Sequence, residues 1–346
     1  MQKRASGVLL HPTSLPGNHG IGALGAAARS FIDFLVKARQ TYWQILPLGP
    51  TGYGDSPYQC FSSNAGNPYL IDLDQLCTDG FLQASDVPAW HDAHPNVVDY
   101  GAVIDFKMQV LRKAYVSFDA DAHADYGTFM QAQQSWINDY CLFMALKDKF
   151  EKRPWYEWED AYRLRDADTL ATEQEALASE IGFHAFLQFV FFKQWKAIKQ
   201  YANQHGVQII GDIPIYVAMD SSDTWCNPEL FQFDANKTPL AVGGCPPDYF
   251  SETGQLWGNP IYDYAKMEED NFAWWIARIR SNLELYDLIR VDHFRGFAGY
   301  WSIPYGAPTA VTGEWVDGPG KKLFQAIQDA LGEIPIIAED LGLITP

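Results

Sequence analysis

The chain has 346 residues, enough for one large single-core domain with insertions or for two ordinary domains. Its net charge of −18 (25 basic and 43 acidic residues) disfavours nucleic acid and anionic membranes as partners, because both would be repelled. No run approaches the roughly 18 apolar residues of a membrane span. The apolar run Val8-Leu9-Leu10 is too short for a signal peptide. Five scattered cysteines without a C-x-x-C pair indicate reduced thiols, so we expect a cytoplasmic protein. The negative charge favours a neutral ligand.

The first predicted elements form a strand–helix–strand unit. Strands are expected over 7–10 and 42–46, and the apolar residues between them, over 23–39, recur at helical spacing. A loop rich in Gly, Pro, Ser and Asn follows over 49–68. Residues 72–180 then have few β-branched runs and a mainly helical pattern (103–118, 126–150 and from 173 onward), which predicts a helical insertion subdomain.

The alternation of strands and helices resumes after this insertion. A long helix over 183–204 ends before Gly206, and a strand follows over 207–217. Residues 220–264 are irregular and rich in Gly, Pro, Asn and aromatic residues. A loop of that length is usually functional, so we expect a subdomain that covers a substrate. The remaining predicted elements are a helix over 271–285, a strand over 288–292, a helix over 321–331 and a strand over 334–339.

This order of elements predicts an α/β fold, a (β/α)₈ barrel with inserted helical and loop subdomains. About five β/α units are visible, whereas such a barrel has eight. Residues 1–346 are therefore expected to form one catalytic barrel domain that is incomplete at its C-terminal side. An open sheet with an uncovered edge would be prone to aggregate, which favours a longer parent protein.

Three of the predicted strands lead directly into a carboxylate, at Asp212, Asp292 and Glu339. The carboxyl ends of barrel strands meet at one face, so these side chains are expected to converge although they are far apart in sequence. Two carboxylates on either side of a glycosidic bond suffice for glycosyl transfer, and a retaining pair lies about 5–5.5 Å apart. The pattern therefore predicts a site for glycosyl chemistry.

The neighbours of these acids suggest roles for them. Arg290 shares a strand face with Asp292, and a nearby guanidinium favours an ionised, nucleophilic carboxylate. Glu339 follows an apolar run, and partial burial would raise its pKa, as an acid catalyst requires. A structural ion pair and a helix-capping Glu339 fit the same spacing. Asp212 is also compatible with a turn residue, and His293 with either a sugar contact or a histidine that supports the site.

Aromatic residues make up 15% of the chain and include 12 Trp, which suits stacking on sugar rings as well as core packing. The sequence has no metal-ligand motif and no phosphate-binding loop that opens a helix, so we expect neither a metal nor a cofactor.

Five strings of the sequence resemble the 4-α-glucanotransferase family (amylomaltase or disproportionating enzyme) of the α-amylase superfamily. Three of them surround the acids: Gly-Asp-Ile-Pro-Ile-Tyr-Val (211–217), Arg-Val-Asp-His-Phe-Arg-Gly (290–296) and Ile-Ala-Glu-Asp-Leu-Gly (337–342). Two are more specific to this branch: Gly-Pro-Thr-Gly-Tyr-Gly-Asp-Ser-Pro-Tyr (49–58) and Pro-Pro-Asp-Tyr-Phe-Ser-Glu-Thr-Gly-Gln-Leu-Trp-Gly-Asn-Pro (246–260).

The resemblance implies transfer of α-1,4-glucan segments to the 4-hydroxyl of another glucan or glucose, by retaining double displacement through a covalent glycosyl-enzyme. It implies that Asp292 is the nucleophile, that Glu339 is the general acid/base and that Arg290 holds the nucleophile. It further implies that Asp212 and Tyr58 contact sugar in the donor subsites, with Ser56 close by. Asp248, Phe250 and Gln255 would lie in a mobile loop over the substrate, and Trp257 follows that loop. Tyr53 and Tyr100 are similar to aromatic residues at a secondary glucan groove.

The family also has a third catalytic carboxylate, on its seventh strand, and the sequence ends before that motif. The 346-residue chain alone is therefore expected to be inactive, and the function is assigned to its parent protein. Two alternatives are a retaining α-glucan hydrolase and a non-catalytic glucan-binding fragment. The expected partners are maltooligosaccharides and the dextrins of starch or glycogen, and the expected protein is a monomer.

Overall fold

The computed structural model describes residues 4–52, 54–91 and 96–339. They form two compact units, and several segments of the chain contribute to each. The first unit comprises residues 1–50, 65–146 and 174–211, and the second comprises 51–64, 147–173 and 212–346. This division differs from one in which residues 72–180 form a single insertion, because 147–173 belong to the second unit.

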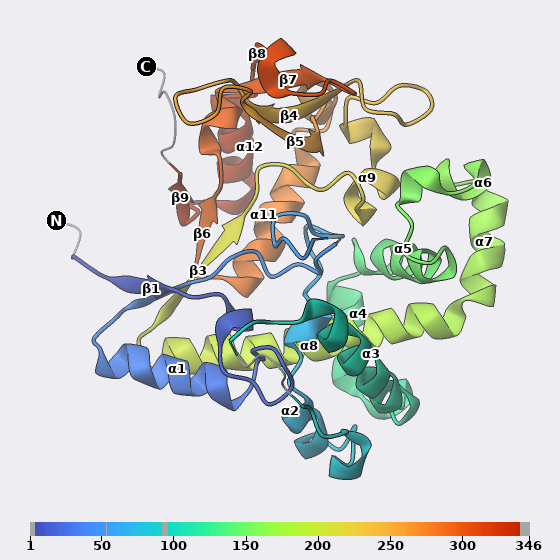
Figure 1. Ribbon diagram of the computed structural model, residues 1–346, viewed down its shortest axis with the longest axis vertical. Coiled ribbons are helices and arrows are strands. Elements are labelled where there is room, and N and C mark those ends of the chain that lie inside the picture. The colour runs from blue at the N-terminus through green and yellow to red at the C-terminus, as the bar shows by residue number, and fades with distance from the viewer. Residues whose placement is uncertain (1–3, 53, 92–95, 340–346) are drawn as a thin grey trace. The chain divides into compact units, whose positions relative to one another are not determined.

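The elements of the first unit are mostly helical (Figure 1). Two short strands flank the first helix, and a third strand follows the last helix and continues into the second unit. In chain order these elements are β1 (Gly7–Leu9), α1 (Ala26–Lys37), β2 (Tyr42–Gln44), α2 (Leu73–Thr78), α3 (Tyr100–Val116), α4 (Ala124–Ala132), α5 (Ile137–Lys149), α8 (Ala178–Gln204) and β3 (Gln208–Ile213).

The second unit combines short helices with two groups of strands (Figure 1). Its helices are α6 (Asp160–Arg163), α7 (Ala167–Ala176, which ends in the first unit), α9 (Ser222–Cys226), α10 (Tyr264–Glu269), α11 (Ala273–Leu285) and α12 (Lys321–Leu331). Its strands are β4 (Ala241–Cys245), β5 (Gln255–Pro260), β6 (Leu288–Val291), β7 (Gly299–Pro304), β8 (Glu314–Asp317) and β9 (Ile336–Ala338).

Five strands form the predicted parallel sheet, in the order β1-β2-β3-β6-β9. In the first unit Trp43 of β2 is fully buried and lies in register with Val8 of β1 and Ile209 of β3. In the second unit β6 pairs with β9, and the N–H that follows β6 donates to the carbonyl of Ile213. All five predicted strands are present, each one to five residues shorter than expected, and the parallel sheet with its helices fits part of a (β/α)₈ barrel.

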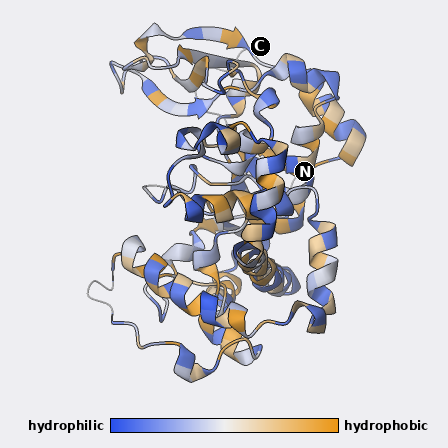
Figure 2. Ribbon diagram, turned by 90° about the vertical axis from the view of Figure 1, so that its right-hand side faces the viewer, coloured by the Kyte–Doolittle hydropathy of each residue, from blue (hydrophilic) through white to orange (hydrophobic). Residues whose placement is uncertain are grey.

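The helix α1 packs against β2 with one apolar side. Figure 2 shows hydrophobic and hydrophilic residues alternating along the helical ribbons, as expected for amphipathic helices. In α1 the fully buried residues are Ala28, Ile32 and Leu35, at the spacing of one helix face. The predicted helix over 126–150 is wrong as a single element, because two helices, α4 and α5, occupy that stretch.

A second sheet was not predicted from the sequence. Residues 220–264 contain β4 and β5, which join β7 and β8 in an antiparallel sheet of order β5-β4-β7-β8. The prediction that this stretch is irregular is therefore wrong. The physical reason lies at Gly243 and Gly244 of β4, because glycine lowers strand propensity but leaves room for neighbouring groups. A Cβ at Gly243 would lie 2.6 Å from the Tyr216 ring, and a Cβ at Gly244 would lie 2.1 Å from the Gln255 carbonyl oxygen.

The long helix α8 holds the loops of the first unit through two side-chain amides. Gln188 accepts from the N–H of Gly66 at 2.7 Å and donates to its carbonyl at 2.9 Å. Gln194 makes the same pair of bonds to Asp72, at 2.7 and 3.0 Å. Both amides are buried, so each satisfies loop backbone groups that would otherwise be costly to bury.

Gly66 is also required by the close approach of α8. A Cβ at this position would lie 1.9 Å from a ring carbon of Phe191, which is fully buried. We predict that Gly66→Ala destabilises the protein by about 1–3 kcal/mol through overpacking. The measurement is the midpoint of urea unfolding. The matched control is Gly127→Ala in α4, where a Cβ would meet no atom within 4 Å. This substitution should raise the free energy of unfolding by up to about 1 kcal/mol, because Ala has the higher helix propensity. Equal midpoints for the two variants would contradict the packing argument.

Candidate active site

The three predicted acids lie at the carboxyl ends of adjacent strands. Asp212 is the next-to-last residue of β3, Asp292 follows β6 and Glu339 follows β9. Backbone bonds continue the sheet past these ends: the N–H of Asp292 donates to the carbonyl of Ile213 at 2.9 Å, and that of Glu339 donates to Val291 at 3.2 Å. The parallel register thus carries the three side chains to one edge of the sheet.

The guanidinium of Arg290 contacts all three carboxylates. Its Nη1 donates to Oδ1 of Asp212 at 2.6 Å, and its Nη2 donates to Oδ1 of Asp292 at 2.9 Å and to Oε1 of Glu339. Two oxygens that bond one nitrogen are each within about 3.2 Å of it, so they are at most roughly 6.4 Å apart. This upper limit is compatible with the separation of about 5–5.5 Å in retaining carboxylate pairs and lies just below the range of about 6.5–9.5 Å for inverting pairs.

The crowding of negative charge sets the protonation of the site. Burial, together with the charges of Glu339 and Asp212, raises the pKa of Asp292 to about 6, and Arg290 only partly opposes this. Arg290 acts in the expected direction, because its charge lowers the pKa of Asp292, but burial and the two other carboxylates outweigh it. Burial also raises the pKa of Asp212, against hydrogen bonds from Tyr58 and the charge of Arg290. Burial works against the charge of Arg290, but the carboxylates outweigh it and raise its pKa.

A cavity of about 350 Å³ lies beside this cluster. Six of the residues proposed from the sequence line it: Ser56, Tyr58, Gln255, Trp257, Asp292 and His293. Five further lining residues were not proposed: Gln59, Pro214, Ile215, Tyr216 and Asn259. The wall thus combines aromatic faces with amide and hydroxyl groups, as small-molecule sites do.

Asp212, Arg290 and Glu339 are outside the lining of this cavity. Both oxygens of Asp212 are engaged, one by Arg290 and the other by the Tyr58 hydroxyl at 2.8 Å, and its side chain is 1% exposed. Asp212 therefore acts on the cavity through Tyr58 in this structure. Glu339 is bound by the N–H of His293 at 2.7 Å as well as by Arg290.

The part of the cavity wall that follows β3 is bound through its backbone carbonyls by residues that are far away in the sequence. Arg278 of α11, which is 3% exposed, donates to the carbonyls of Pro214 at 2.7 Å and Ile215 at 3.1 Å. The hydroxyl of Tyr262 also donates to Ile215, at 3.0 Å, and Asn259 donates to the carbonyl of Val217 at 2.8 Å. Nothing in the local sequence signals Arg278, because it lies more than 60 residues from the carbonyls that it binds.

His293 occupies a special position in the site. Its backbone is in the left-handed region (φ 49°), which directs its N–H to Glu339, and its ring contacts Trp257 edge-on at 4.9 Å. Burial lowers its pKa, so the imidazole is neutral and can donate or accept a hydrogen bond at the cavity wall.

Asp248, Phe250 and Tyr100 are not among the residues that line the cavity. Asp248 and Phe250 are exposed in the connection between β4 and β5, and Asp248 accepts from the N–H groups of Phe250 and Ser251 at 2.8 Å each. Tyr100 begins α3 in the first unit. Tyr53 lies outside the described residues.

Within 4–52, 54–91 and 96–339, no group of three or more His, Cys, Asp or Glu side chains is arranged to hold a metal ion. Over those same ranges, every helix is too short or too polar to span a bilayer.

The fold and the site define a parallel α/β protein with a carboxylate cluster at the strand ends. A family profile described as 4-alpha-glucanotransferase matches residues 10–346, and the chain belongs to this family. It is 50% identical to a 4-alpha-glucanotransferase of Clostridium butyricum over 338 residues, which are 97% of this chain and 69% of the relative. It is also 50% identical to a 4-alpha-glucanotransferase of Thermus thermophilus over 347 residues, which are 99% of this chain and 69% of the relative. The predicted family membership is confirmed.

Solved structures agree with this assignment. An amylomaltase from Streptococcus agalactiae, solved in complex with acarbose, is 46% identical, with a TM-score of 0.95 over 99% of this chain and 70% of that one. An amylomaltase from Corynebacterium glutamicum is 20% identical, with a TM-score of 0.77 over 99% and 48%, and shows the shared fold alone. The predicted fold class is confirmed.

The raised pKa of Asp292 predicts a pH dependence of stability. The pKa is about 6 in the folded state against 3.8 for the free group, so folding favours the protonated form. This contribution is fully present below about pH 4 and is lost as the pH rises through about 6. Asp292→Asn, which is always neutral, should therefore stabilise the protein relative to wild type by about 1–2 kcal/mol more at pH 7 than at pH 4, after allowance for partial exposure.

Thermal unfolding of both proteins across this pH range makes the measurement. Asp317→Asn, which changes an exposed carboxylate at the end of β8, is the control and should show no such dependence. A stability difference that stays constant or shrinks between pH 4 and pH 7 would contradict the role of carboxylate crowding.

Proposed function

We propose that this protein transfers α-1,4-glucan segments from one maltooligosaccharide or starch chain to the 4-hydroxyl of another glucan or of glucose. The observation that carries the proposal is the single nitrogen of Arg290 that binds both Asp292 and Glu339. Membership of the 4-alpha-glucanotransferase family and the acarbose complex of a related amylomaltase support an α-glucan as the ligand.

The mechanism that fits this geometry is a retaining double displacement. An oxygen of Asp292 attacks the anomeric carbon, the bond to the leaving sugar breaks, and Glu339 gives a proton to the leaving oxygen. Glu339 then takes the proton of an acceptor 4-hydroxyl, whose oxygen displaces Asp292 and restores the free carboxylate. Two inversions at one carbon give retention. The limit of roughly 6.4 Å between the two carboxylate oxygens supports this course over single inversion.

The charge of the cluster favours the transition state of this reaction. Asp212, Asp292 and Glu339 supply three carboxylates against one guanidinium. Positive charge that develops on the sugar ring would be stabilised by this excess of negative charge, because the three carboxylates are buried or partly buried. Burial and this same excess of negative charge raise the pKa of Asp292, so the stabilisation and part of the pKa shift have a common cause.

Transfer rather than hydrolysis requires that an acceptor sugar binds and that water is excluded. Trp257 and Tyr58 offer aromatic faces in the cavity, and Phe250 is 93% exposed on the connection between β4 and β5. We propose that a bound glucan chain covers Phe250 and that Asp248 shapes the turn that presents it. The protein is proposed to act as a cytoplasmic monomer without a cofactor.

The first test is incubation of the full-length protein with maltotriose. Transfer predicts glucose together with maltooligosaccharides longer than the substrate, resolved by chromatography. Glucose and maltose without longer products would identify a hydrolase instead. Maltooligosaccharide binding without any product would identify a non-catalytic binding protein.

The second test assigns the two carboxylates. Asp292→Asn and Glu339→Gln should each lower kcat/KM with maltotriose by at least about 100-fold, because attack and proton transfer lose their reacting oxygens. Asp317→Asn is the control, since its carboxylate is exposed on β8. More than about a tenth of wild-type activity in Asp292→Asn, about 1.4 kcal/mol of barrier, would refute the nucleophile assignment.

The pH–rate profile gives a further prediction. Asp292 must be ionised to attack, and its pKa is raised to about 6 by burial and by its acidic neighbours. The rate should therefore rise with pH between about 5 and 7, with an acid limb centred near 6, well above the range of an ordinary carboxyl. Initial rates with maltotriose in buffers of constant ionic strength measure this. A flat profile over this range would show that Asp292 titrates lower in the working enzyme.

A further inference from the structure

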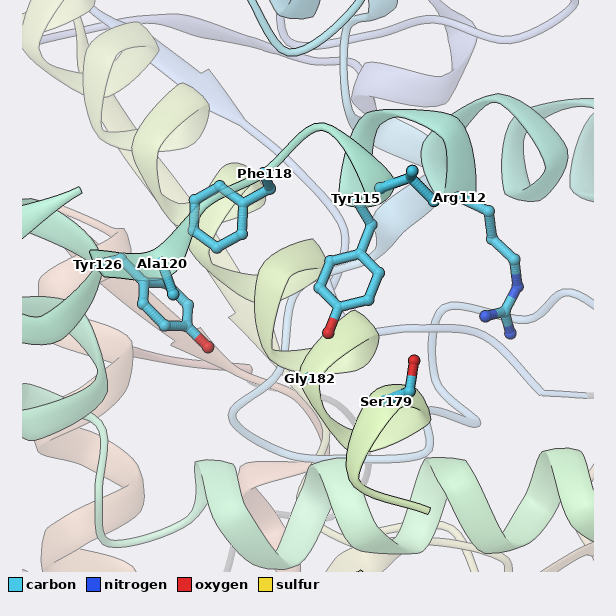
Figure 3. A pocket seen from close by; sticks show the side chains of 8 residues that line it. Arg112, Tyr115, Phe118, Ala120, Tyr126, Ser179 and Gly182 are labelled. Atoms are coloured by element: carbon cyan, nitrogen blue, oxygen red, sulfur yellow. The ribbon is translucent and has the colours of Figure 1, made fainter. Parts of the chain in front are cut away.

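A second cavity, of about 440 Å³, lies in the first unit, between the end of α3, the segment that leads into α4, and the first turns of α8. Its volume is in the range of about 300–1,000 Å³ that is usual for small-molecule sites. The principal lining residues are Arg112, Tyr115, Phe118, Tyr126, Ser179 and Gly182 (Figure 3). None of them belongs to the carboxylate cluster or to the residues proposed at its cavity.

Packing holds the aromatic side chains of this cavity in place. Phe118 contacts Tyr126 edge-on at 5.1 Å, and Tyr126 contacts Phe189 of α8 edge-on at 5.4 Å. Tyr115 packs on Phe183 and Phe186 of the same helix. Because the rings are already ordered, a ligand that lies against them would lose little affinity to side-chain ordering.

Gly182 is the position that allows this arrangement. A Cβ there would lie 2.3 Å from the Tyr115 hydroxyl, so only glycine lets that hydroxyl approach the helix. Figure 3 shows the Tyr115 hydroxyl beside the Gly182 turn, and the hydroxyls of Tyr115 and Tyr126 both point downward in this view. Neither hydroxyl has a hydrogen-bond partner within the described ranges of the chain. Burial raises the pKa of Tyr126 to about 12, so its hydroxyl stays protonated and can both donate and accept.

The charged groups at the rim cancel each other. Arg112 binds Glu180 through both of its terminal nitrogens, at 3.1 and 2.5 Å, so the guanidinium already has its counter-charge. An anion would have to compete with Glu180, and the net charge of −18 disfavours it further. The cavity therefore offers ring faces, hydroxyl groups and no net charge, which suits a neutral ligand rich in hydroxyls.

We propose that this cavity binds a glucosyl unit of an α-glucan chain, through residues of the first unit that take no part in the carboxylate cluster. The choice of ligand class depends on the proposed function, because the protein would meet α-glucans as its substrates. The sugar ring lies against Phe118 or Tyr126 and exchanges hydrogen bonds with the Tyr115 and Tyr126 hydroxyls. Binding here involves no chemistry and does not require Arg112 to leave Glu180.

The test uses the full-length protein with Asp292→Asn, which prevents turnover, and maltoheptaose as the probe. Hydrogen–deuterium exchange should show protection of 115–126 and 178–183 in addition to 255–259 at the carboxylate cavity. The double variant Tyr115→Phe/Tyr126→Phe keeps the ring packing and removes only the hydroxyls. It should weaken maltoheptaose binding at this cavity about tenfold. Ser179→Trp, on the exposed first turn of α8, should block the cavity without a change in the core.

Tyr42→Phe, a part-exposed tyrosine of β2 outside the cavity, is the matched control and should bind as wild type. Protection of 255–259 without protection of 115–126, or unchanged protection of 115–126 in both cavity variants, would overturn the proposal. Protection of 115–126 by inorganic phosphate in place of maltoheptaose would also overturn it, in favour of an anion site. If maltotriose yields no transfer product and 115–126 is still protected by maltoheptaose, the proposed function fails and this inference stands.

Discussion

One guanidinium holds together the acids of three strands. Asp212, Asp292 and Glu339 come from β3, β6 and β9, and without Arg290 they would place three carboxylates at one sheet edge with no counter-charge. Removing the partner of a buried charge is far more costly than removing an exposed one. Arg290 is suited to this task because its planar fork presents separate nitrogens in fixed directions, whereas a lysine would offer one point charge. The position of Arg290 two residues before Asp292 follows from strand geometry, which returns a side chain to the same face at every second residue.

The cavity depends on a different kind of constraint, the satisfaction of backbone carbonyls. The chain leaves β3 without regular structure over 214–217, yet Ile215, Tyr216 and Val217 are buried. Buried carbonyl groups need donors, and Arg278, Tyr262 and Asn259 supply them from elements that come later in the sequence. The wall of the cavity is thus only as rigid as α11 and the strand β5 that carry two of these donors. The shape of the cavity wall therefore depends on how α11 and β5 pack within the second unit.

Sequence patterns were sufficient for the parallel sheet because its signals are local. Runs of β-branched residues ending in an acid are visible within six residues, and the strands that they predicted are all present. The second sheet was missed because Gly243 and Gly244 in β4 look like loop residues, and only the neighbouring ring and carbonyl explain them. The same limit applies to Gln59, Asn259 and Tyr216, which line the cavity through contacts that no short-range pattern encodes. Acids could be found from spacing, whereas the residues that support them required the fold.

The direction of the Asp292 pKa shift shows why pairwise reasoning fails at such a site. Considered with Arg290 alone, Asp292 should be a stronger acid, because an opposite charge favours the ionised form. In the fold it also faces Glu339 and Asp212 and is partly removed from water, and these effects together exceed the attraction of a guanidinium that three carboxylates share. A positive charge divided among three acids neutralises none of them fully. The arrangement therefore retains an excess of negative charge at the strand ends, which is what a ligand with developing positive charge would require. The raised pKa of Asp292 and the capacity of the site to stabilise such a ligand are two consequences of one geometry, and neither can be changed without the other.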